Sequence, residues 1–567
     1  MNGKPENTRI YNLLIAVVAA LLFIPFLGGV HLFDWDEINF AESAREMIAS
    51  GDYLTVQINF IPFWEKPPLF IWMQVASMKV FGINEFAARL PNAICGIITL
   101  LVLFNIGKRI RDVGFGTTWV LMYAGSMLPF LYFKSGIIDP FFNLFIFTGI
   151  YRFHLYFESP QNRMRNAVIS AVLIGLAILT KGPVALLIFL LTFGVFMVVP
   201  KFRVNIRLKD VMAFVIVLIF TGGFWFILQI MQGNFGIIAD FVQYQIRLFN
   251  TQDAGHGGFL LYHFVVLLIG VFPASILALP ALLPAKYSSI KDNAFYIWML
   301  ILFWVVLLLF TIVRTKIVHY SSLCYFPLTF LASWAIYYSE TSFTRSWRKV
   351  VVSFILSTGL IIALIIIGLT FLDEYKQALI EFLRIKDPFG IANLSADGEW
   401  RGFEFLTGLL LIAGLTVFLI LFRRRFEHAV RILNVFVGVF MFFSMLLIAP
   451  RVEAYSQRAV IEFFKSVSDE DAYLLTVGYK SYAHLFYGKV RDHSSIKDSY
   501  EKDWLLQGEI NKPVYVSAKI TRKEKMMKDY PQLKLLYEKN GFVFFKRLPV
   551  STSPTSDSPL VSKLKLI

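Results

Sequence analysis

The amino-acid sequence predicts an all-α polytopic membrane protein that carries a small C-terminal α/β domain. Hydrophobic residues make up 57% of the 567 residues and charged residues only 16%, whereas a soluble protein carries roughly 25% charged residues. Apolar runs of about 20 residues, the length that crosses a bilayer, recur along the first 450 residues. Beyond residue 450 polar and charged residues become frequent, which marks a change of domain.

About thirteen segments have the length and hydropathy of a membrane-spanning helix. The first of them is long, ends without a small-residue cleavage site and is followed by more spans, so we expect an anchor rather than a signal peptide. The sequence Lys181-Gly182-Pro183 divides one long apolar stretch into two spans. The segments lie near residues 10–30, 86–107, 113–133, 137–157, 165–180, 183–200, 209–231, 259–282, 293–313, 317–337, 348–371, 404–423 and 429–449.

Lysine and arginine in the short loops predict the orientation, because cytoplasmic loops are enriched in these residues. An N-terminus in the cytoplasm places every short basic loop on the cytoplasmic side, and an odd number of spans then places the C-terminal domain outside. The formal net charge of +15 is mostly a topology signal, and we expect no nucleic-acid binding. The cytoplasmic loops contain Lys108, Arg109, Arg111, Arg152, Arg163, Arg165, Lys201, Arg203, Arg207, Lys209, Lys286, Lys291, Arg345, Arg348, Lys349, Arg423, Arg424, Arg425 and Arg431.

The domain boundaries follow from composition. Residues 1–450 form the transmembrane domain, residues 451–550 an outward α/β domain, and the Ser/Pro-rich residues 551–567 a disordered tail. Lys539-Asn540-Gly541 is typical of a β-hairpin turn. Strand-like runs lie at residues 472–477, 514–518, 533–537 and 542–546.

The first outward loop, residues 31–85, gathers carboxylates beside aromatic and apolar residues. It contains Phe33-Asp34-Trp35-Asp36-Glu37 and Phe63-Trp64-Glu65-Lys66-Pro67-Pro68. Removing a carboxylate from water is costly unless a cation, a metal or a hydrogen-bond donor compensates. The cluster therefore predicts a functional site at the membrane surface.

Two interfacial helices are expected in this loop. Residues 38–50 place apolar side chains on one face and Glu42, Arg45 and Glu46 on the other, the pattern of a helix lying in the membrane interface. Residues 68–81 are apolar but short for a span, so we expect an interfacial or re-entrant helix. Such helices would hold the loop carboxylates at the depth of lipid head groups.

Further ionisable residues lie at span ends on the same outward face. Each alone has a simple explanation as a solvated or snorkelling end residue. Their recurrence on one face favours a shared site, because ionisable groups beside a membrane are costly. The whole set is Asp34, Asp36, Glu37, Glu65, Lys66, Lys134, Asp139, Lys181, Arg247, His256, His263, Arg314, Lys316 and His319.

Two of these residues allow two interpretations each. Lys181 is either a snorkelling lysine in a turn or a cation placed for an anionic phosphate. Asp139, in Ile138-Asp139-Pro140, either stabilises a helix N-terminus or adds a carboxylate that holds a metal or a cationic partner. Hard oxygen ligands from Asp36 or Glu65 suit magnesium, manganese or calcium, and zinc stays open. No histidine pair has the spacing of a helical zinc motif.

Several motifs resemble one enzyme family. They are Asp36-Glu37, Arg45-Glu46-Met47, Glu65-Lys66-Pro67-Pro68, Ala88-Arg89-Leu90-Pro91, Leu179-Thr180-Lys181-Gly182-Pro183 and Lys316-Ile317-Val318-His319-Tyr320. Together they resemble the C-type, polyprenyl-phosphate-sugar-dependent glycosyltransferases. Within that family the chain is similar to the bacterial aminoarabinose lipid A transferases, which are related to protein O-mannosyltransferases. The match is strongest over residues 33–91.

The resemblance implies a multi-pass enzyme of the bacterial inner membrane with its C-terminal domain in the periplasm. The donor would be a sugar on undecaprenyl phosphate, the acceptor a glycolipid such as lipid A or a protein, and transfer would invert the anomeric centre. Asp36 and Glu37 would form the catalytic pair. Donor-phosphate contacts would come from Lys66, Lys181 and Arg247, and metal ligands from Glu65, Asp139 and, as a substitute, His256.

The chain departs from the aminoarabinose enzymes within the same motifs. Asn39 stands where they usually carry arginine, and Phe63 where they carry tyrosine. Val242-Gln243-Tyr244-Gln245 replaces a stretch rich in histidine and glutamate before Arg247. These differences bear on the metal site and on the aminoarabinose specificity that the resemblance implies.

Two functions other than sugar transfer are alternatives for a membrane protein of this kind. A transporter or flippase of lipid-linked sugars would concentrate ionisable residues near the bilayer midplane, whereas here they gather at one face. A membrane scaffold whose C-terminal domain binds a partner is the third reading. Sugar transfer needs cations for the leaving phosphate and a carboxylate base for an acceptor hydroxyl, and the outward face supplies both.

Overall fold

The computed structural model describes residues 8–198, 206–250, 257–282, 294–338, 344–493, 495–496 and 498–549. His256 and the tail predicted to be disordered, residues 551–567, lie outside these ranges. The chain divides into two compact units. The first comprises residues 1–374 and 399–453, and the second residues 375–398 and 454–567.

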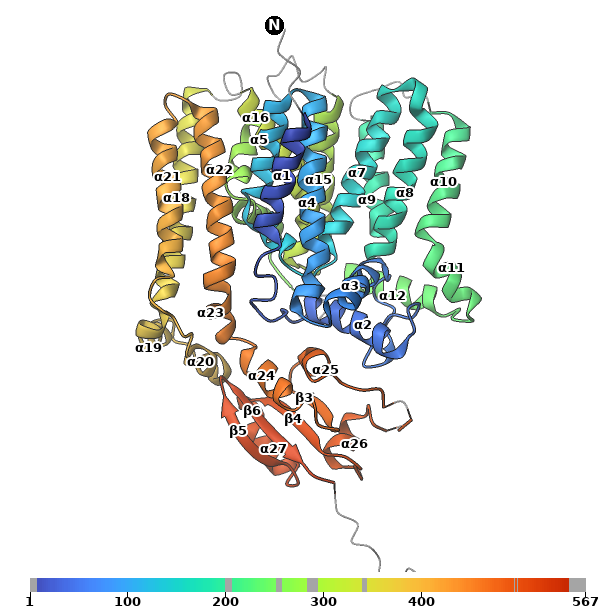
Figure 1. Cartoon of the computed structure of the whole chain (residues 1–567), viewed down its shortest axis with the longest axis vertical. Helices are drawn as coiled ribbons and strands as arrows, with labels where there is room; N and C mark the ends of the chain where they lie inside the picture. The colour runs from blue at the N-terminus through green and yellow to red at the C-terminus, as the bar shows by residue number, and fades with distance from the viewer. Residues whose placement is uncertain are drawn as a thin grey trace, which may run out of the picture. The chain divides into compact units, whose positions relative to one another are not determined.

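The first unit is a bundle of helices drawn side by side in Figure 1. The mostly helical fold predicted from composition is thereby confirmed. Its long helices are α1 (Thr8–Phe23), α4 (Glu85–Ile110), α5 (Val113–Ala124), α6 (Met127–Phe133), α7 (Asp139–Glu158), α8 (Arg163–Lys181), α9 (Val184–Val198), α10 (Leu208–Gly222), α11 (Phe224–Met231), α13 (Tyr262–Gly270), α14 (Ala274–Leu282), α15 (Ala294–Ile312), α16 (Tyr325–Tyr337), α18 (Arg345–Thr370), α21 (Phe405–Leu421) and α22 (Phe426–Phe443).

Every apolar segment predicted as a span overlaps one of these helices or two consecutive ones. Among the described residues five helices are long and apolar enough to cross a membrane, and two bent pairs raise that number to as many as seven. The pairs are α10 with α11, bent by 56°, and α13 with α14, bent by 119°. The count of about thirteen spans stays a prediction.

Aromatic side chains and small residues fill the core of the bundle. Trp119, Trp298 and Trp334 are almost fully buried. Helices α4 and α5 approach closely because Gly107 faces Gly116, where an added Cβ on Gly107 would lie 2.8 Å from the Gly116 Cα. Small residues at helix contacts are the usual means of close packing between membrane helices.

Helices α2 (Asp36–Ser50), α3 (Leu69–Phe81) and α12 (Ile237–Asn250) lie at one end of the bundle (Figure 1). The prediction that α2 exposes a charged face is wrong, because Glu42, Arg45 and Glu46 are all buried. The Arg45 guanidinium donates to both carboxylate oxygens of Glu42, at 2.6 and 2.7 Å. A buried charge is tolerated when it is paired in this bidentate way, and a helical pattern alone does not reveal such a pair.

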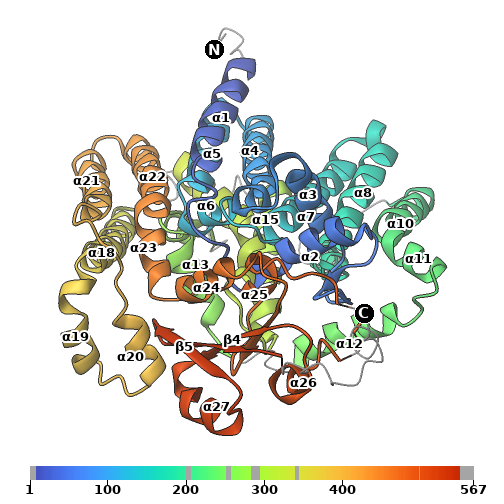
Figure 2. The same ribbon diagram turned by 60° about the horizontal axis from the view of Figure 1, so that its bottom comes forward.

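The second unit contains a four-stranded sheet in the order β3-β4-β6-β5. Strand β3 (Tyr473–Val477) is parallel to β4 (Val514–Lys519), whereas β5 (Lys534–Lys539) and β6 (Phe542–Arg547) form an antiparallel hairpin. The hairpin turns at Asn540 and Gly541, both with positive φ, as that sequence predicts. Figure 2 shows the sheet with α26 (Lys502–Gln507) and α27 (Lys523–Asp529) beside it.

The second unit also includes residues 375–398, which the sequence assigns to the transmembrane domain. They contain the end of α19 (Leu372–Phe382) and α20 (Pro388–Leu394). The Phe389 ring packs against Phe542 with 5.2 Å between centroids, and the Lys519 ammonium lies 4.4 Å from the same ring centre. Composition could not predict this association, because it depends on contacts far apart in the sequence.

Candidate functional site

Asp36 is the first residue of α2, and its carboxylate is partly exposed. Its side chain is 39% exposed. The nearest side chain that can carry a positive charge is His319, whose Nε2 lies 3.6 Å from Oδ2, and no other described residue donates a hydrogen bond to the carboxylate. His319 belongs to the short 3-10 helix η3 (Val318–Cys324). Asp36 is therefore positioned by its helix while both of its oxygens stay available.

Glu37, the neighbouring carboxylate, is buried, and both of its oxygens accept hydrogen bonds. Arg89 donates to it from Nε and Nη2, at 3.0 and 2.7 Å, and the Phe33 N–H donates at 2.8 Å. The Gly136 N–H also donates to Oε1. Glu37 thus links the Asp36 segment to α4 and to the residues that precede α7. This arrangement favours a positioning role over the catalytic role expected from the sequence.

Two buried cations hold the chain that leads into the loop. Arg89 also donates to three backbone carbonyls, and Lys134 donates to three others. These carbonyls belong to Leu27, Val30 and His31 for Arg89, and to Leu22, Phe23 and Pro25 for Lys134. Both cations satisfy peptide groups that would otherwise be unpaired at the end of α1, so they fix the direction in which the loop leaves the bundle.

A small hairpin shapes the other half of the loop. Strands β1 (Gln57–Ile58) and β2 (Ile61–Pro62) are joined by Asn59 and Phe60, which both have positive φ. The N–H groups of these two residues donate to the two carboxylate oxygens of Glu46, at 2.7 and 2.8 Å. Burial and the nearby Glu42 carboxylate raise the pKa of Glu46 to about 9. Glu46 therefore holds the hairpin in place just ahead of Glu65 and Lys66.

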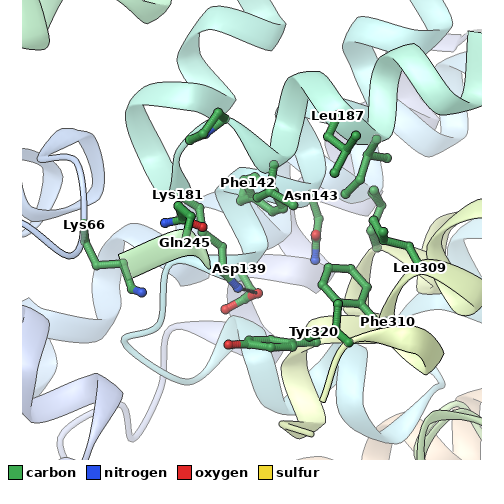
Figure 3. A pocket seen from close by; sticks show the side chains of 15 residues that line it. Lys66, Asp139, Phe142, Asn143, Lys181, Leu187, Gln245, Leu309, Phe310 and Tyr320 are labelled. Atoms are coloured by element: carbon green, nitrogen blue, oxygen red, sulfur yellow. Dashed lines mark hydrogen bonds and ion pairs between the residues drawn. The ribbon is translucent and has the colours of Figure 1, made fainter. Parts of the chain in front are cut away.

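A cavity of about 270 Å³ opens beside this loop. One end is polar, and the rest is apolar (Figure 3). The polar lining is Lys66, Asp139, Asn143, Lys181, Gln245 and Tyr320. The apolar lining is Phe142, Pro183, Val184, Leu187, Ile188, Leu309, Phe310, Val313 and Leu323. The cavity thus has the character of a site for an amphiphile with a charged head and an apolar tail.

Lys181 and Asp139 form an ion pair at the polar end. Lys181 Nζ lies 2.6 Å from Asp139 Oδ1, and both side chains are largely buried. Asp139 begins α7, and Lys181 is the last residue of α8. Gly182 follows with φ of 102°, a conformation that glycine adopts without strain, and α9 begins at Val184. The sharp break predicted at Lys181-Gly182-Pro183 is confirmed, and it places the ammonium at the cavity.

Lys66 approaches the same end from the loop. Its ammonium donates to the Tyr244 hydroxyl at 3.1 Å and lies 4.8 Å from the centre of that ring. Among the described residues Lys66 has no carboxylate partner. Arg247, one turn of α12 after Tyr244, lies 3.5 Å from Glu65 Oε1 with half of its side chain exposed. A pair this exposed to solvent is weak.

Of the three predicted metal ligands, the structure describes Glu65 and Asp139, whereas His256 lies outside the described residues. Within the described ranges no group of three or more His, Cys, Asp or Glu side chains could hold a metal ion. Glu65 faces Arg247, and Asp139 faces Lys181. Asp139 Oδ2 is a buried oxygen without a hydrogen-bond partner, but one oxygen is too few for a metal centre. The residues present fit an anion held by lysine and arginine better than a metal.

The structure adds residues that sequence reasoning missed. In α12, Tyr244 contacts Lys66 and Gln245 lines the cavity. In the sequence both residues stand out only as departures from a family pattern. Asn143 lies one turn after Asp139 on the same face of α7, so helical spacing could have revealed it. Tyr320 lines the cavity while its neighbour His319 contacts Asp36. This pair of residues connects the loop of residues 31–85 to the cavity.

The chain is similar in sequence to several known proteins. Residues 65–225 match the family described as dolichyl-phosphate-mannose-protein mannosyltransferase. A relative from Photorhabdus laumondii, an undecaprenyl phosphate-alpha-4-amino-4-deoxy-L-arabinose arabinosyl transferase, is 24% identical over 56% of this chain and 58% of its own length. A relative of the same name from Shewanella sediminis is 26% identical over 57% of this chain and 60% of its own length. The chain therefore matches less than two thirds of these relatives.

The fold extends the similarity along the whole chain. The crystal structure of ArnT from Cupriavidus metallidurans bound to undecaprenyl phosphate superimposes with a TM-score of 0.73 at 18% identity, covering 96% of this chain and 98% of ArnT. The apo structure of the same protein gives a TM-score of 0.74. The resemblance expected from the sequence is confirmed: the chain has the fold of a C-type glycosyltransferase and is similar to the aminoarabinose lipid A transferases and, over residues 65–225, to the protein mannosyltransferases.

Proposed function

We propose that this chain is an integral membrane glycosyltransferase that takes a sugar from a polyprenyl-phosphate donor. The observation that carries the proposal is the cavity with Lys66 and Lys181 at one end and apolar side chains along the rest. A polyprenyl phosphate has the same division into an anionic head and an apolar tail. The similarity to enzymes named for an undecaprenyl-phosphate donor supports this choice.

Cations in the cavity would stabilise the leaving phosphate. Bond cleavage between the sugar C1 and the phosphate oxygen leaves an additional negative charge on the polyprenyl phosphate, and fixed cations lower the energy of that state. Lys66 is available for this role because no described carboxylate neutralises it. Lys181 would contact the phosphate while it remains paired with Asp139. Arg247 would exchange its weak contact with Glu65 for a contact with the phosphate.

Asp36 would act on the acceptor. The acceptor oxygen forms a bond to C1 while the bond from C1 to the donor phosphate breaks, and the polyprenyl phosphate departs with the bonding electrons. When the acceptor is a hydroxyl, Asp36 takes its proton as general base. When the acceptor is a phosphate no proton has to move, and Asp36 balances the charge of the cations around the reaction. A single displacement of this kind inverts the anomeric centre.

A divalent metal stays outside this mechanism. Asp139 pairs with Lys181 and Glu65 with Arg247, and the described residues contain no group of three metal-ligating side chains. We therefore assign the electrostatic work to Lys66, Lys181 and Arg247 and derive no step through a metal.

The first donor and acceptor to test follow from the relatives. Aminoarabinose on undecaprenyl phosphate is the donor in their names, and lipid A is the acceptor that the resemblance implies. Asn39 and Phe63 depart from those enzymes in the catalytic loop, so a panel of other sugars on undecaprenyl phosphate belongs in the same assay. We place the reaction on the outer face of the bacterial inner membrane, with a protein acceptor as the second choice.

The experiment is sugar transfer by the purified protein in nanodiscs, followed by mass spectrometry of lipid A. The wild type is expected to add one sugar, and Asp36→Asn and Lys181→Ala are expected to abolish the addition at unchanged expression. Glu85→Gln, at the partly exposed N-terminus of α4, is the control and should keep activity. Retained activity in both site variants would overturn the assignment of the site. Translocation of the lipid without sugar transfer would instead favour the flippase.

A further inference from the structure

The 3-10 helix η3 contributes two adjacent residues to two different parts of the site. His319 Nε2 lies 3.6 Å from Asp36 Oδ2, whereas Tyr320 lines the donor cavity (Figure 3). No other described side chain forms an ion pair with Asp36 or donates a hydrogen bond to it. The proposed reaction gives a role to Asp36 and to the cavity, but none to His319.

Hydrogen bonds from two neighbouring helices hold η3 in place. The Ser322 hydroxyl donates to the His319 carbonyl at 2.5 Å, and Asn143 of α7 donates to that same hydroxyl at 2.8 Å. On the other side the Ser321 hydroxyl lies 3.1 Å from Nδ1 of His263, a residue of α13. Both serines are buried. The backbone that carries the His319 imidazole is therefore fixed relative to α7 and α13.

The His319 ring is more deeply buried than the carboxylate that it faces. Its side chain is 15% exposed, compared with 39% for Asp36. Besides Asp36, the charged groups that act on the ring electrostatically are Asp139, Lys66 and Lys181. Lys181 is paired with Asp139, and Lys66 donates to a tyrosine hydroxyl of α12. The imidazole therefore remains as the side chain placed to donate to Asp36.

A carboxylate that acts on an acceptor has to present one oxygen to it in a defined direction. Asp36 has no hydrogen-bond donor in this structure, so nothing distinguishes its two oxygens. A bond from the Nε2–H of His319 to Oδ2 would fix the plane of the carboxylate and leave Oδ1 for the acceptor. Such bonds are often long before substrates bind and shorten in the reacting complex. The distance of 3.6 Å has to close by only about 0.5 Å to reach the hydrogen-bond range.

We propose that His319 is a positioning residue for Asp36 in sugar transfer. When a polyprenyl-phosphate lipid occupies the cavity lined by Tyr320, the His319 Nε2–H donates to Asp36 Oδ2, and Oδ1 faces the acceptor. A hydroxyl acceptor then passes its proton to Oδ1 as its oxygen bonds to C1 and the bond from C1 to the donor phosphate breaks. This inference rests on the proposed function and deepens it, because His319 acts on the rate of transfer and binds neither substrate.

The test compares two substitutions of this histidine, with aminoarabinose on undecaprenyl phosphate as the donor and lipid A as the acceptor. His319→Phe keeps an aromatic ring but has no N–H, whereas His319→Gln keeps an N–H donor. We expect His319→Phe to lower kcat about tenfold to a hundredfold, the effect of losing one hydrogen bond to a charged group. His319→Gln should recover most of that loss. The KM for the donor and the melting temperature should stay at wild-type values in both variants.

The matched control is His428→Phe, which makes the same change at an exposed histidine of α22. It should keep the wild-type kcat. Three results would each overturn the proposal. The first is a wild-type kcat for His319→Phe, and the second is an equal loss in His319→Phe and His319→Gln. The third is a loss accompanied by a lower melting temperature or a higher KM for the donor, because that result assigns His319 to folding or to donor binding.

A structural measurement separates this inference from the proposed function. If the wild type transfers no sugar, the proposed function fails, and cryo-electron microscopy of the wild type with bound undecaprenyl phosphate then tests the contact itself. His319 Nε2 is expected within about 3.2 Å of Asp36 Oδ2 in that complex. A separation that stays at 3.6 Å or becomes longer would overturn the positioning role, whatever the activity of the protein.

Discussion

The two neighbouring carboxylates Asp36 and Glu37 differ in the number of hydrogen bonds and ion pairs that they form. Asp36 has one distant partner, His319, and is partly exposed. Its chain neighbour Glu37 is buried and accepts from Arg89 and from two backbone N–H groups. The sequence shows two adjacent acidic residues beside aromatic ones, which predicts a site but cannot assign their roles. The difference depends on Arg89, which lies 52 residues later in the chain.

This contrast predicts opposite phenotypes for two neighbouring substitutions. Glu37→Gln leaves the buried Arg89 without its counter-charge, and breaking a buried ion pair in this way costs about 3–5 kcal/mol. We expect a clear fall in the melting temperature in detergent. Asp36→Asn removes a charge with no close partner, so its melting temperature should match the wild type while transfer is lost. Equal melting temperatures for the two variants would contradict the roles given to them.

Among the elements, the β1–β2 hairpin is expected to make the stability of the protein depend on pH. The pKa of Glu46 is raised to about 9 by burial and by Glu42, so the folded state holds this proton more tightly than the unfolded chain. Stability is then complete below the unfolded pKa and falls as pH rises toward 9. We expect the melting temperature to decline between pH 6 and pH 9, and Glu46→Gln to flatten that decline.

The matched control for the hairpin is Glu524→Gln, which changes an exposed carboxylate of α27. It should keep the full decline of the wild type. An identical pH profile for Glu46→Gln and the wild type would show that this carboxyl does not control the hairpin.

The turn between α8 and α9 provides a second test at this scale. At Gly182, φ is 102° and an added Cβ would lie 2.6 Å from the Phe241 ring, so Gly182→Ala is expected to destabilise the fold and displace Lys181. At Gly194, within α9, an added Cβ meets nothing within 4 Å, and alanine favours the helix by about 0.5–1 kcal/mol. For Gly182→Ala, the melting temperature and the affinity for the donor lipid should both fall. For Gly194→Ala, neither should fall below its wild-type value. The same result in both variants would refute the assigned geometry.

Elements with a local signal were predictable from the sequence. Lys181-Gly182-Pro183 breaks the helix because glycine and proline act locally, and Asn540-Gly541 forms its hairpin turn for the same reason. The burial of Glu42, Arg45 and Glu46 was not predictable. A helical charge pattern is the same whether the charged face is exposed to solvent or is buried with its charges paired. The periodicity of residues 38–50 therefore predicted a helix correctly but predicted the wrong burial for its charged face.

For the whole molecule, the orientation predicted from the basic loops can be tested by cysteine labelling. Cys95 and Cys324 are buried, so background labelling is low. Ile61→Cys, in the exposed β2 strand, should react with a membrane-impermeant maleimide from outside, and Gln161→Cys only after permeabilisation. Labelling of Gln161→Cys alone in intact cells would mean that the protein has the opposite orientation.

The long-range parts of the architecture could not be obtained from composition. The strands of the second unit have clear local patterns, whereas residues 375–398 join that unit only through contacts such as Phe389 with Phe542. The donor cavity likewise depends on contacts between residues that are far apart in the sequence. Lys66 and Lys181 are separated by more than one hundred residues, and only the packing of the loop against α7, α8 and α12 brings them to one apolar cavity.

The most direct test of the account is binding of undecaprenyl phosphate to the delipidated protein, measured by native mass spectrometry. The wild type should retain one lipid, and Lys66→Met should weaken binding about tenfold to a hundredfold, because one charged hydrogen bond contributes about 1.5–3 kcal/mol. Lys79→Met, an exposed lysine of α3, should bind as the wild type does. Equal binding by wild type and Lys66→Met, or no binding by the wild type, would contradict the claim that this cavity holds a polyprenyl phosphate.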